Sequence, residues 1–299
     1  FTSHEVEPAK VKLDKPHVLI RTKLEGTTTK SNLVKPPITS KHYIKIVKDV
    51  SVINEELLKH QFGLPSSIKE AGPPLQGQKS HYPICFNELF DNNLRIRLQR
   101  LFSSADLKKH GRYYTTLQSL SKKVRPYLTI DGEGTVELDY AGLHYNIAYN
   151  KNGLEMLEYP YQHPDIPPDL FKTACIIALN TKNKGAASGA IRKTIDNPPD
   201  GVNWAGMSAK AVLQAVIDKH LAIKDKMFQE YGLYFMNIDS DIATDVIRHF
   251  TKLGEGILPL HDSFVVRAAM HQELVKVMNE SYKNHLNFEP YCVEVKNAA

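Results

Sequence analysis

The sequence predicts a mixed α/β (α+β) fold, because its strand and helix patterns alternate without the regular spacing of a doubly wound sheet. Two segments carry this prediction. Residues 135–139 alternate apolar and polar side chains as a half-buried strand does, and a helical period begins soon after, at Leu143. Residues 256–267 read GILPLHDSFVVR, in which apolar flanks enclose a polar trio, and this pattern is typical of a β-hairpin.

The N-terminal part of the chain favours short elements. Residues 1–50 are rich in Lys, Thr and Val and contain several prolines, which predicts short strands and loops. Apolar residues recur at helical spacing in residues 52–60 and 86–102, so we expect helices there. The Gly/Pro/Ser-rich stretch between them, GLPSSIKEAGPPLQGQ, predicts a loop.

The C-terminal half contains three clearer helices. The first is predicted from the N-cap Ser208 to residue 231, before Gly232. The second covers residues 242–253, with Asp239, Ser240 or Asp241 near its start and Gly254 just past its end. The third covers residues 271–285, where apolar residues share one face.

The composition indicates a globular protein with one large or two small domains. The 299 residues are 42% hydrophobic and 24% charged, and no apolar run approaches the roughly 18 residues of a membrane helix. The opening residues lack the layout of a signal peptide, so we expect a cytoplasmic protein without a membrane segment. The three distant cysteines, Cys85, Cys175 and Cys292, exclude a disulfide framework and CxxC motifs.

Positive charge is concentrated in the first half of the chain. Residues 1–150 carry 22 Lys and Arg against 15 Asp and Glu, whereas residues 151–299 carry 16 against 18. This distribution suits a polyanionic partner such as nucleic acid, and a mildly basic solvated surface is the alternative.

Two aspartates occupy positions where reactive groups are common. Asp139 lies near the end of the predicted strand, and Asp262 lies in the turn of the predicted hairpin, whose first strand Pro259 restricts to an edge or a bulge. Each aspartate has a structural alternative, as a cap or as a turn residue. If the two meet in space, their carboxylates are suited to holding two divalent cations for phosphoryl transfer.

Two longer stretches around these aspartates resemble the palm of family A nucleic-acid polymerases, the group of bacterial DNA polymerase I and the phage-type single-subunit RNA polymerases. The first stretch is GRYYTTLQSLSKKVRPYLTIDGEGTVELDYAGL, and the second is MNIDSDIATDVIRHFTKLGEGILPLHDSFVVR. The likeness covers roughly residues 111–285. The trio His261-Asp262-Ser263 is the form of the phage-type RNA polymerases, whereas the DNA polymerases usually have His-Asp-Glu.

The resemblance implies a right-hand polymerase palm with reduced helical fingers and a basic N-terminal region. It implies that Asp139 and Asp262 bind two Mg²⁺ or Mn²⁺ ions and are catalytic. It also implies nucleic-acid contacts for a further set of side chains, namely Arg112, Gln118, Arg125 and His261. Glu137 shares a face with Asp139 and is either an additional ligand or the partner in a salt bridge.

The nucleotide-binding positions depart from the family pattern. In DLFKTACIIALN, Lys172 is the candidate phosphate ligand, but Pro168 stands four residues before it and Leu179-Asn180 stands where Tyr-Gly is expected. Arg192 is a further candidate for neutralising phosphates, or part of a solvated surface. His144 occupies the position where the DNA polymerases carry a Glu that excludes the ribose 2′-hydroxyl, so sugar choice stays open.

The sequence therefore predicts template-directed nucleotidyl transfer on a primer and template from nucleoside triphosphates, with DNA synthesis slightly favoured and a protein partner possible. Residues 1–110 are predicted to form a thumb-like or template-binding region. Residues 111–299 are predicted to form the palm, with a fingers-like insertion at about 150–236. Two alternatives remain: an inactive polymerase-derived module that binds nucleic acid, and an HD-type phosphohydrolase, which requires its His-Asp pair on a helix.

Overall fold

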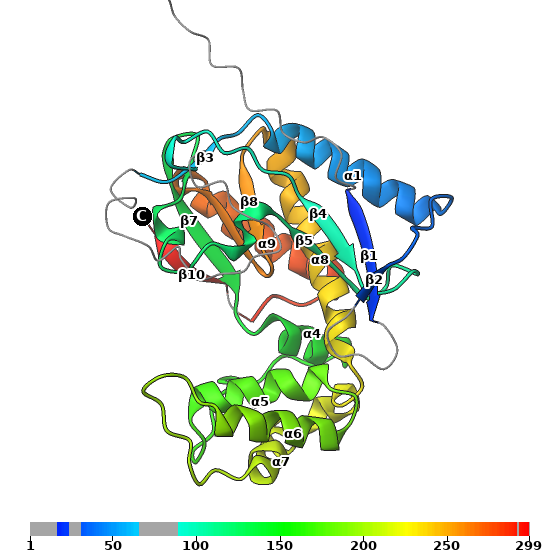
Figure 1. Ribbon diagram of the computed structural model, residues 1–299, viewed down its shortest axis with the longest axis vertical. Coiled ribbons are helices and arrows are strands. Elements are labelled where there is room, and N and C mark those ends of the chain that lie inside the picture. The colour runs from blue at the N-terminus through cyan, green and yellow to red at the C-terminus, as the bar shows by residue number, and fades with distance from the viewer. Residues whose placement is uncertain (1–16, 24–30, 66–88, 292, 299) are drawn as a thin grey trace, which may run out of the picture.

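The structure is a computed structural model that describes residues 17–23, 31–65, 89–291 and 293–298. Figure 1 shows an upper body that contains the strands and a lower lobe that is made of helices. The long helix α8 (Tyr231–Leu253) rises from the helical lobe through the upper body towards α1 (Lys41–Leu57). The mixed α/β class predicted from the sequence is confirmed, with two sheets in the upper body.

The smaller sheet has the strand order β2-β1-β4-β5. Its strands are β1 (Val18–Lys23), β2 (Ser31–Leu33), β4 (Gln99–Phe102) and β5 (His110–Tyr114). Strands β1 and β4 pair in parallel, and β4 and β5 form an antiparallel hairpin. The boundary predicted at residue 110 falls inside this hairpin, so the predicted N-terminal region and the predicted palm share one sheet.

The larger sheet is antiparallel and has the order β3-β6-β7-β9-β8, with β10 also paired to β7. Its strands are β3 (Phe62–Gly63), β6 (Thr129–Ile130), β7 (Glu133–Tyr140), β8 (Ile257–Leu260), β9 (Ser263–Arg267) and β10 (Val293–Ala298). The predicted strand and the predicted hairpin are therefore both confirmed, as β7 and as the β8–β9 pair. Pro259 is tolerated because β8 lies at the edge of the sheet, where a missing N–H donor costs least.

The helices divide between the two parts of the molecule. The helical lobe is formed by α5 (Pro168–Asn180), α6 (Lys184–Asp196) and α7 (Ala209–Lys219). The short α4 (Leu143–Lys151) lies between this lobe and the sheets, and α9 (His271–Leu286) packs in the upper body against α8. Short 3-10 helices are η1 (Thr116–Ser119), η2 (Arg125–Tyr127), η3 (Leu221–Lys226) and η4 (Ala268–Met270).

Several predicted helix boundaries were wrong. The helix predicted for residues 208–231 ends at Lys219, because η3 and two residues with positive φ, Phe228 and Glu230, interrupt it. The helix predicted for residues 242–253 begins eleven residues earlier, at Tyr231, so the three candidate cap residues lie inside α8.

The helix predicted for residues 86–102 was wrong over most of its described part: Leu89 and Phe90 are helical, whereas residues 91–102 are not. Leu94, Ile96 and Leu98 are buried and alternate with the less buried Arg95 and Arg97. This period of two belongs to extended chain, and the segment leads directly into β4. The spacing of four between Leu94 and Leu98 fits either period, which explains the error.

The remaining predictions about the ends and loops are partly outside the described residues. In residues 1–50 the two predicted short strands are present, but a long helix, α1, begins at residue 41. Most of the loop predicted after residue 63, together with Cys85 and Cys292, lies outside the described residues, whereas Cys175 is a buried free thiol. No helix within the described parts of the chain combines the length and apolarity needed to cross a membrane.

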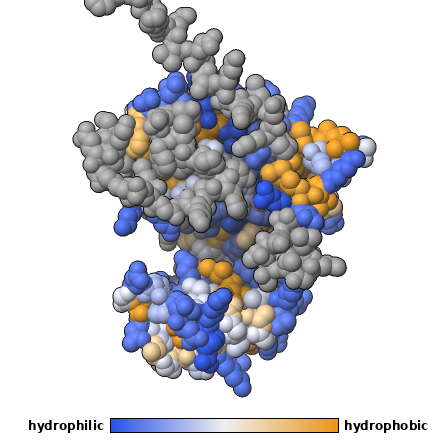
Figure 2. Space-filling view, viewed as in Figure 1, coloured by the Kyte–Doolittle hydropathy of each residue, from blue (hydrophilic) through white to orange (hydrophobic). Residues whose placement is uncertain are grey.

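The surface in Figure 2 is mostly hydrophilic over the helical lobe and has an apolar area at the side of the upper body where α1 lies. Helix α1 exposes Ile44 and Val52 to solvent, and Leu33 and Ile38 immediately before it are also exposed. Its opposite side is buried through Ile46, Val50, Ile53 and Leu57.

Candidate active site

The structure brings the backbones of the two predicted aspartates together. Asp139 is the penultimate residue of β7, and Asp262 lies in the two-residue turn between β8 and β9. In the β7–β9 ladder Asp139 is the partner of Ser263, and the backbone N–H of Tyr140 donates to the carbonyl oxygen of Asp262 at 3.3 Å. Both aspartates therefore lie at the same end of two neighbouring strands.

The alternation of β7 decides which side each residue faces. Tyr140 faces α9, since its hydroxyl donates to the carbonyl of Met278 at 2.6 Å. Asp139 therefore faces the other side, where the residue is 8% exposed. Asp262 is half-buried in its turn, and the preceding His261 has φ +65°, which lets the chain reverse within two residues.

A buried ion-pair network adjoins this end of the sheet. Arg112 on β5 donates through Nε to both carboxylate oxygens of Asp239 on α8, at 3.0 and 3.2 Å. The Nε2 atom of His144 on α4 lies 2.8 Å from Oδ2 of Asp239 and 3.1 Å from Nη2 of Arg112. Three elements that are distant in sequence thus meet on one carboxylate, whose side chain is only 1% exposed.

Arg112 connects this network to the aspartates. Burial opposes its charge, but the carboxylate of Asp239, with a smaller contribution from Asp262, raises the pKa of the guanidinium above its usual value. Arg112 therefore stays charged beside Asp262 and offsets part of the negative charge of the two aspartates.

Aromatic rings and histidines line the adjoining side of the hairpin turn. The ring of His261 meets Tyr114 edge to face at 5.7 Å, and Tyr114 meets His110 in the same way at 5.8 Å. Desolvation and the nearby Arg112 lower the pKa of His110 to about 4, and the same two causes lower the pKa of His261. Both imidazoles are therefore neutral at pH 7.

Two of the predicted nucleic-acid ligands, Arg125 and Gln118, lie on the short 3-10 helices that precede β7. Arg125 on η2 pairs with Glu137 at 3.3 Å, and the hydroxyl of Ser263 donates to the same carboxylate oxygen at 2.9 Å. The salt bridge predicted as one role of Glu137 is confirmed. Gln118 lies on η1, and its buried Oε1 has no hydrogen-bond partner among the described residues. The nucleic-acid roles of Arg125 and Gln118 stay predictions.

The predicted nucleotide ligands of the helical lobe differ in their relation to the site. Lys172 on α5 is exposed, and its Nζ lies 5.5 Å from the centre of the Tyr161 ring. Burial, then Cys175 and, as a smaller contribution, Asp262, raise the pKa of Tyr161 above its usual value. Arg192 is exposed on α6, and no hydrogen bond or ion pair described for the chain links it to the aspartates.

The donor atoms at the strand ends fit a divalent cation of the magnesium type. Asp139 and Asp262 supply carboxylate oxygens, which Mg²⁺ prefers, and such an ion commonly takes its remaining ligands from water and substrate phosphates. Within the described residues no group of three or more His, Cys, Asp or Glu side chains is arranged to hold a metal.

Sequence reasoning missed two members of this neighbourhood, Asp239 and Tyr161. Asp239 appeared only as a possible helix start, yet it shares a helix face with the buried Phe235, Ile242 and Val246. A carboxylate on an apolar stripe requires a buried partner, and this was the available signal. Tyr161 lies outside every motif, and no pattern in the sequence distinguishes it from the other tyrosines.

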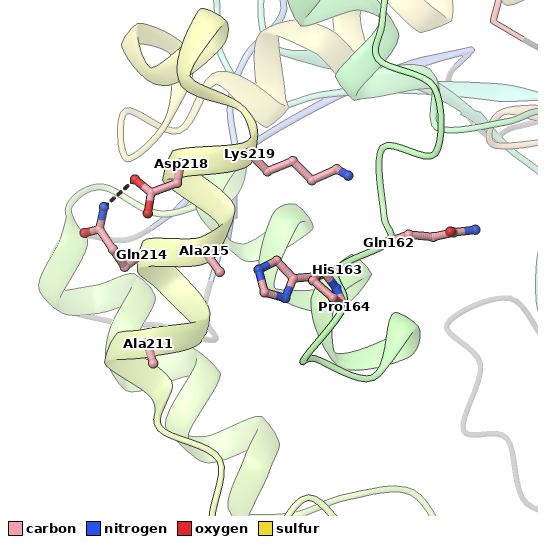
Figure 3. Close-up of a pocket in the computed structure, with 8 residues that line it drawn as sticks. All are labelled: Gln162, His163, Pro164, Ala211, Gln214, Ala215, Asp218 and Lys219. Carbon is pink, nitrogen blue, oxygen red and sulfur yellow. Dashed lines mark hydrogen bonds between the residues drawn. The ribbon is translucent and has the colours of Figure 1, made fainter.

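A separate cavity of about 500 Å³ lies in the helical lobe (Figure 3). It is bounded by α7 and by residues 162–164, where His163 faces the helix. Gln214 and Asp218, which are hydrogen-bonded to each other at 2.8 Å, lie at its edge. None of the predicted site residues lines this cavity.

Comparison with solved structures finds distant structural similarity. Neither a protein-family model nor a curated protein matches the chain. A solved structure described as the POL domain of Pol1 from M. smegmatis in complex with DNA primer-template and dNTP is similar at a TM-score of 0.37 and 14% sequence identity. The match covers 67% of this chain and 47% of the other, so this chain spans about half the length of that neighbour.

Proposed function

We propose that this protein is a template-directed nucleotidyltransferase of the family A polymerase type, which extends a 3′-hydroxyl on a nucleic-acid template and releases pyrophosphate. The observation that carries the proposal is the meeting of Asp139 and Asp262 at one end of neighbouring strands, joined by the backbone hydrogen bond from Tyr140 to Asp262. The two aspartates at the centre of the sequence resemblance are thus neighbours, which supports the proposal.

The residues around the aspartates fit distinct roles in this reaction. Asp139 and Asp262 hold the two Mg²⁺ or Mn²⁺ ions, which when bound activate the attacking hydroxyl and stabilise the leaving pyrophosphate. Arg112 is held by Asp239 and offsets negative charge beside Asp262. His261, neutral and packed on Tyr114, supports the hairpin turn and the primer end.

The nucleotide is proposed to enter from the helical lobe. Lys172, which is exposed on α5 with its Nζ near the Tyr161 ring, is proposed to pair with the triphosphate. His144 occupies the sugar-selecting position but is engaged with Arg112 and Asp239. We propose deoxynucleotides as the preferred substrates.

The arrangement of elements fits a division into palm and reduced fingers. The larger sheet with α8 and α9 serves as the palm, and α5, α6 and α7, within the predicted insertion at about 150–236, serve as the fingers. The smaller sheet and α1, within residues 1–110 apart from β5, serve as the thumb-like or template-binding part.

Primer extension tests the proposal. A labelled primer on a DNA template is incubated with Mg²⁺ or Mn²⁺ and with dNTPs or NTPs, using the wild type, Asp262→Asn and the control Asp200→Asn. Asp200 is exposed, and its substitution makes the same chemical change outside the site. We expect template-matched extension to fall about 1,000-fold in Asp262→Asn, because a metal ligand contributes several kcal/mol to the transition state, and to persist in Asp200→Asn.

Two outcomes would contradict the proposal. If the wild type binds primer and template but extends nothing, and Asp262→Asn binds equally well, the protein is a nucleic-acid-binding module. If phosphate esters are hydrolysed without extension, the phosphohydrolase alternative applies. The structure places the His261-Asp262 pair in a hairpin turn and not on the helix that this alternative requires.

A further inference from the structure

A second cavity, of about 520 Å³, lies between α4 and the C-terminal end of α9. Its volume is within the range of small-molecule sites in proteins. Neither Asp139 nor Asp262 lines it, so it is separate from the candidate active site. The side chains that define it are Asn146, Asn150, Met156, Lys283, Phe288 and Tyr291.

Asn146 is the unusual member of this lining. The residue is 3% exposed, and no side-chain hydrogen bond is described for it; its amide is not among the fully buried polar atoms that lack a partner, so its amide atoms remain accessible at the cavity. Asn150, one turn later, is satisfied: its Oδ1 accepts from Tyr282 at 2.5 Å and its Nδ2 donates to the carbonyl of Leu154 at 2.9 Å. An amide that is accessible only at the cavity is free to hydrogen-bond with whatever occupies that cavity, so Asn146 is the polar group that a ligand there would meet.

The cavity lining combines polar side chains with an aromatic and apolar part formed by Met156, Phe288, Pro290 and Tyr291. The hydroxyl of Tyr291 accepts from the backbone N–H of Tyr159 at 3.4 Å, which anchors this ring at the cavity. Phe288 is half-buried and packs against the core, and Met156 adds a flexible apolar contact. Such walls favour a flat ring, because aromatic side chains stack on planar systems.

The charges at the cavity argue against an anionic ligand. Lys283 pairs with Glu289 at 2.5 Å, so its positive charge is compensated. Glu155 also lines the cavity and adds a negative charge. A phosphate group would find no uncompensated cation among these lining residues, whereas an uncharged ring would enter without an electrostatic penalty.

We propose that this cavity binds an uncharged nucleobase, with Asn146 reading its edge. A carboxamide presents a donor and an acceptor side by side, which matches the donor–acceptor edges of nucleobases. Asn146 follows His144 by two residues on α4, so the helix presents them in different directions, towards the cavity and towards Asp239. The proposal does not depend on nucleotidyl transfer at the aspartates.

Calorimetric titration of the full chain with adenosine, guanosine, cytidine and uridine tests this site. We expect at least one nucleoside to bind the wild type, and the matching nucleoside monophosphate to bind more weakly. Asn146→Leu is expected to weaken binding about ten-fold or more, through loss of the amide hydrogen bonds. The control Asn197→Leu, at an exposed asparagine that does not line the cavity, is expected to bind as the wild type does.

Further variants separate folding from recognition. Asn146→Leu removes an amide for which no hydrogen bond within the protein is described, so its melting temperature should stay close to that of the wild type. Tyr291→Leu removes one wall without touching α4 and should also weaken binding. Asp262→Asn should bind nucleosides normally, so failure of the polymerase proposal and failure of this one are distinguishable.

A competition experiment distinguishes a free nucleoside from a base within a nucleic-acid strand. Single-stranded oligonucleotides with and without that base are added to the complex. If only the oligonucleotide that contains the base displaces the nucleoside, the natural ligand is a base within a nucleic-acid strand. If neither displaces it, the natural ligand is a free nucleoside. The proposal is overturned if no nucleoside binds the wild type at about 1 mM. It is also overturned if Asn146→Leu and Tyr291→Leu both retain wild-type affinity.

Discussion

The ends of β7 and the β8–β9 hairpin differ from the helical lobe in how their charged residues are buried and paired. At the strand ends, Arg112, His144 and Asp239 come from three different elements and are paired in a buried network beside Asp262. In the helical lobe, Lys172 and Arg192 are exposed. The difference teaches that the charges of the first region are already organised by the fold, whereas these two basic residues of the second are left exposed by it.

The largest expected effect is the loss of Asp239. Asp239→Ala leaves the buried charge of Arg112 uncompensated, so we expect the free energy of unfolding to fall by about 3–5 kcal/mol. Asp218→Ala, at an exposed aspartate on α7, is expected to change it by less than about 0.5 kcal/mol. Urea denaturation monitored by circular dichroism measures both. Equal effects would show that the two regions are not organised differently.

The next effect is a pH dependence that the two regions share. Burial lowers the pKa of His110, at the strand ends, and of His220, in the helical lobe, from 6.5 to about 4. Because both folded pKa values lie below the unfolded value, the stabilisation is present above pH 6.5 and is lost as the pH falls towards 4. For the fully buried His220 the loss amounts to about 3 kcal/mol.

Denaturation of His220→Phe between pH 7 and pH 4 isolates this contribution. The hydroxyl of Tyr149 donates to Nδ1 of His220, and Nε2 donates to the carbonyl of Pro160. The variant should be less stable at pH 7 but lose less stability on acidification than the wild type. His42→Gln, at an exposed histidine, should retain the wild-type slope. An unchanged slope in His220→Phe would contradict the assignment.

A smaller effect distinguishes the two basic residues of the helical lobe. We expect Lys172→Ala to raise the KM for the incoming nucleotide about ten-fold, because a charged hydrogen bond to phosphate contributes about 1.5–3 kcal/mol. Arg192→Ala should change this KM less than two-fold, since nothing described connects Arg192 with the hairpin turn. Steady-state extension with varied nucleotide concentration measures both. The reverse order would move the nucleotide site towards α6.

The smallest expected change in stability comes from the hairpin turn. His261 has φ +65°, a conformation that glycine adopts without steric cost. His261→Gly relieves this steric cost, but it also removes the edge-to-face contact with Tyr114 and gives the unfolded chain more freedom. Because these effects oppose one another, the free energy of unfolding should change by less than about 1 kcal/mol. Extension should fall nevertheless, because the proposed support for the primer end is removed. Stability and extension lost together would assign His261 a purely structural role.

Local patterns explain which elements could be predicted. The period of two in β7 and the apolar flanks of residues 256–267 predicted both strand segments, because each pattern lies within a few residues. The boundaries of α7 and α8 were mispredicted. Positive φ angles at Phe228 and Glu230 interrupt the helix, and neither residue type favours that conformation, so no local pattern indicates the interruption. The same limit applies to residues 94–98, whose apolar spacing fits two periods.

The sequence by itself determined the class of fold, the strand that carries Asp139 and the turn that carries Asp262, because side-chain period and turn chemistry act over short distances. Only the tertiary structure decided that the two aspartates are neighbours, since their proximity depends on the register between β7 and β9. It likewise decided that Asp239 joins Arg112 to His144 and that Asn146 faces a cavity. These contacts connect residues from different elements, and no local pattern records which distant side chain will complete a buried polar group.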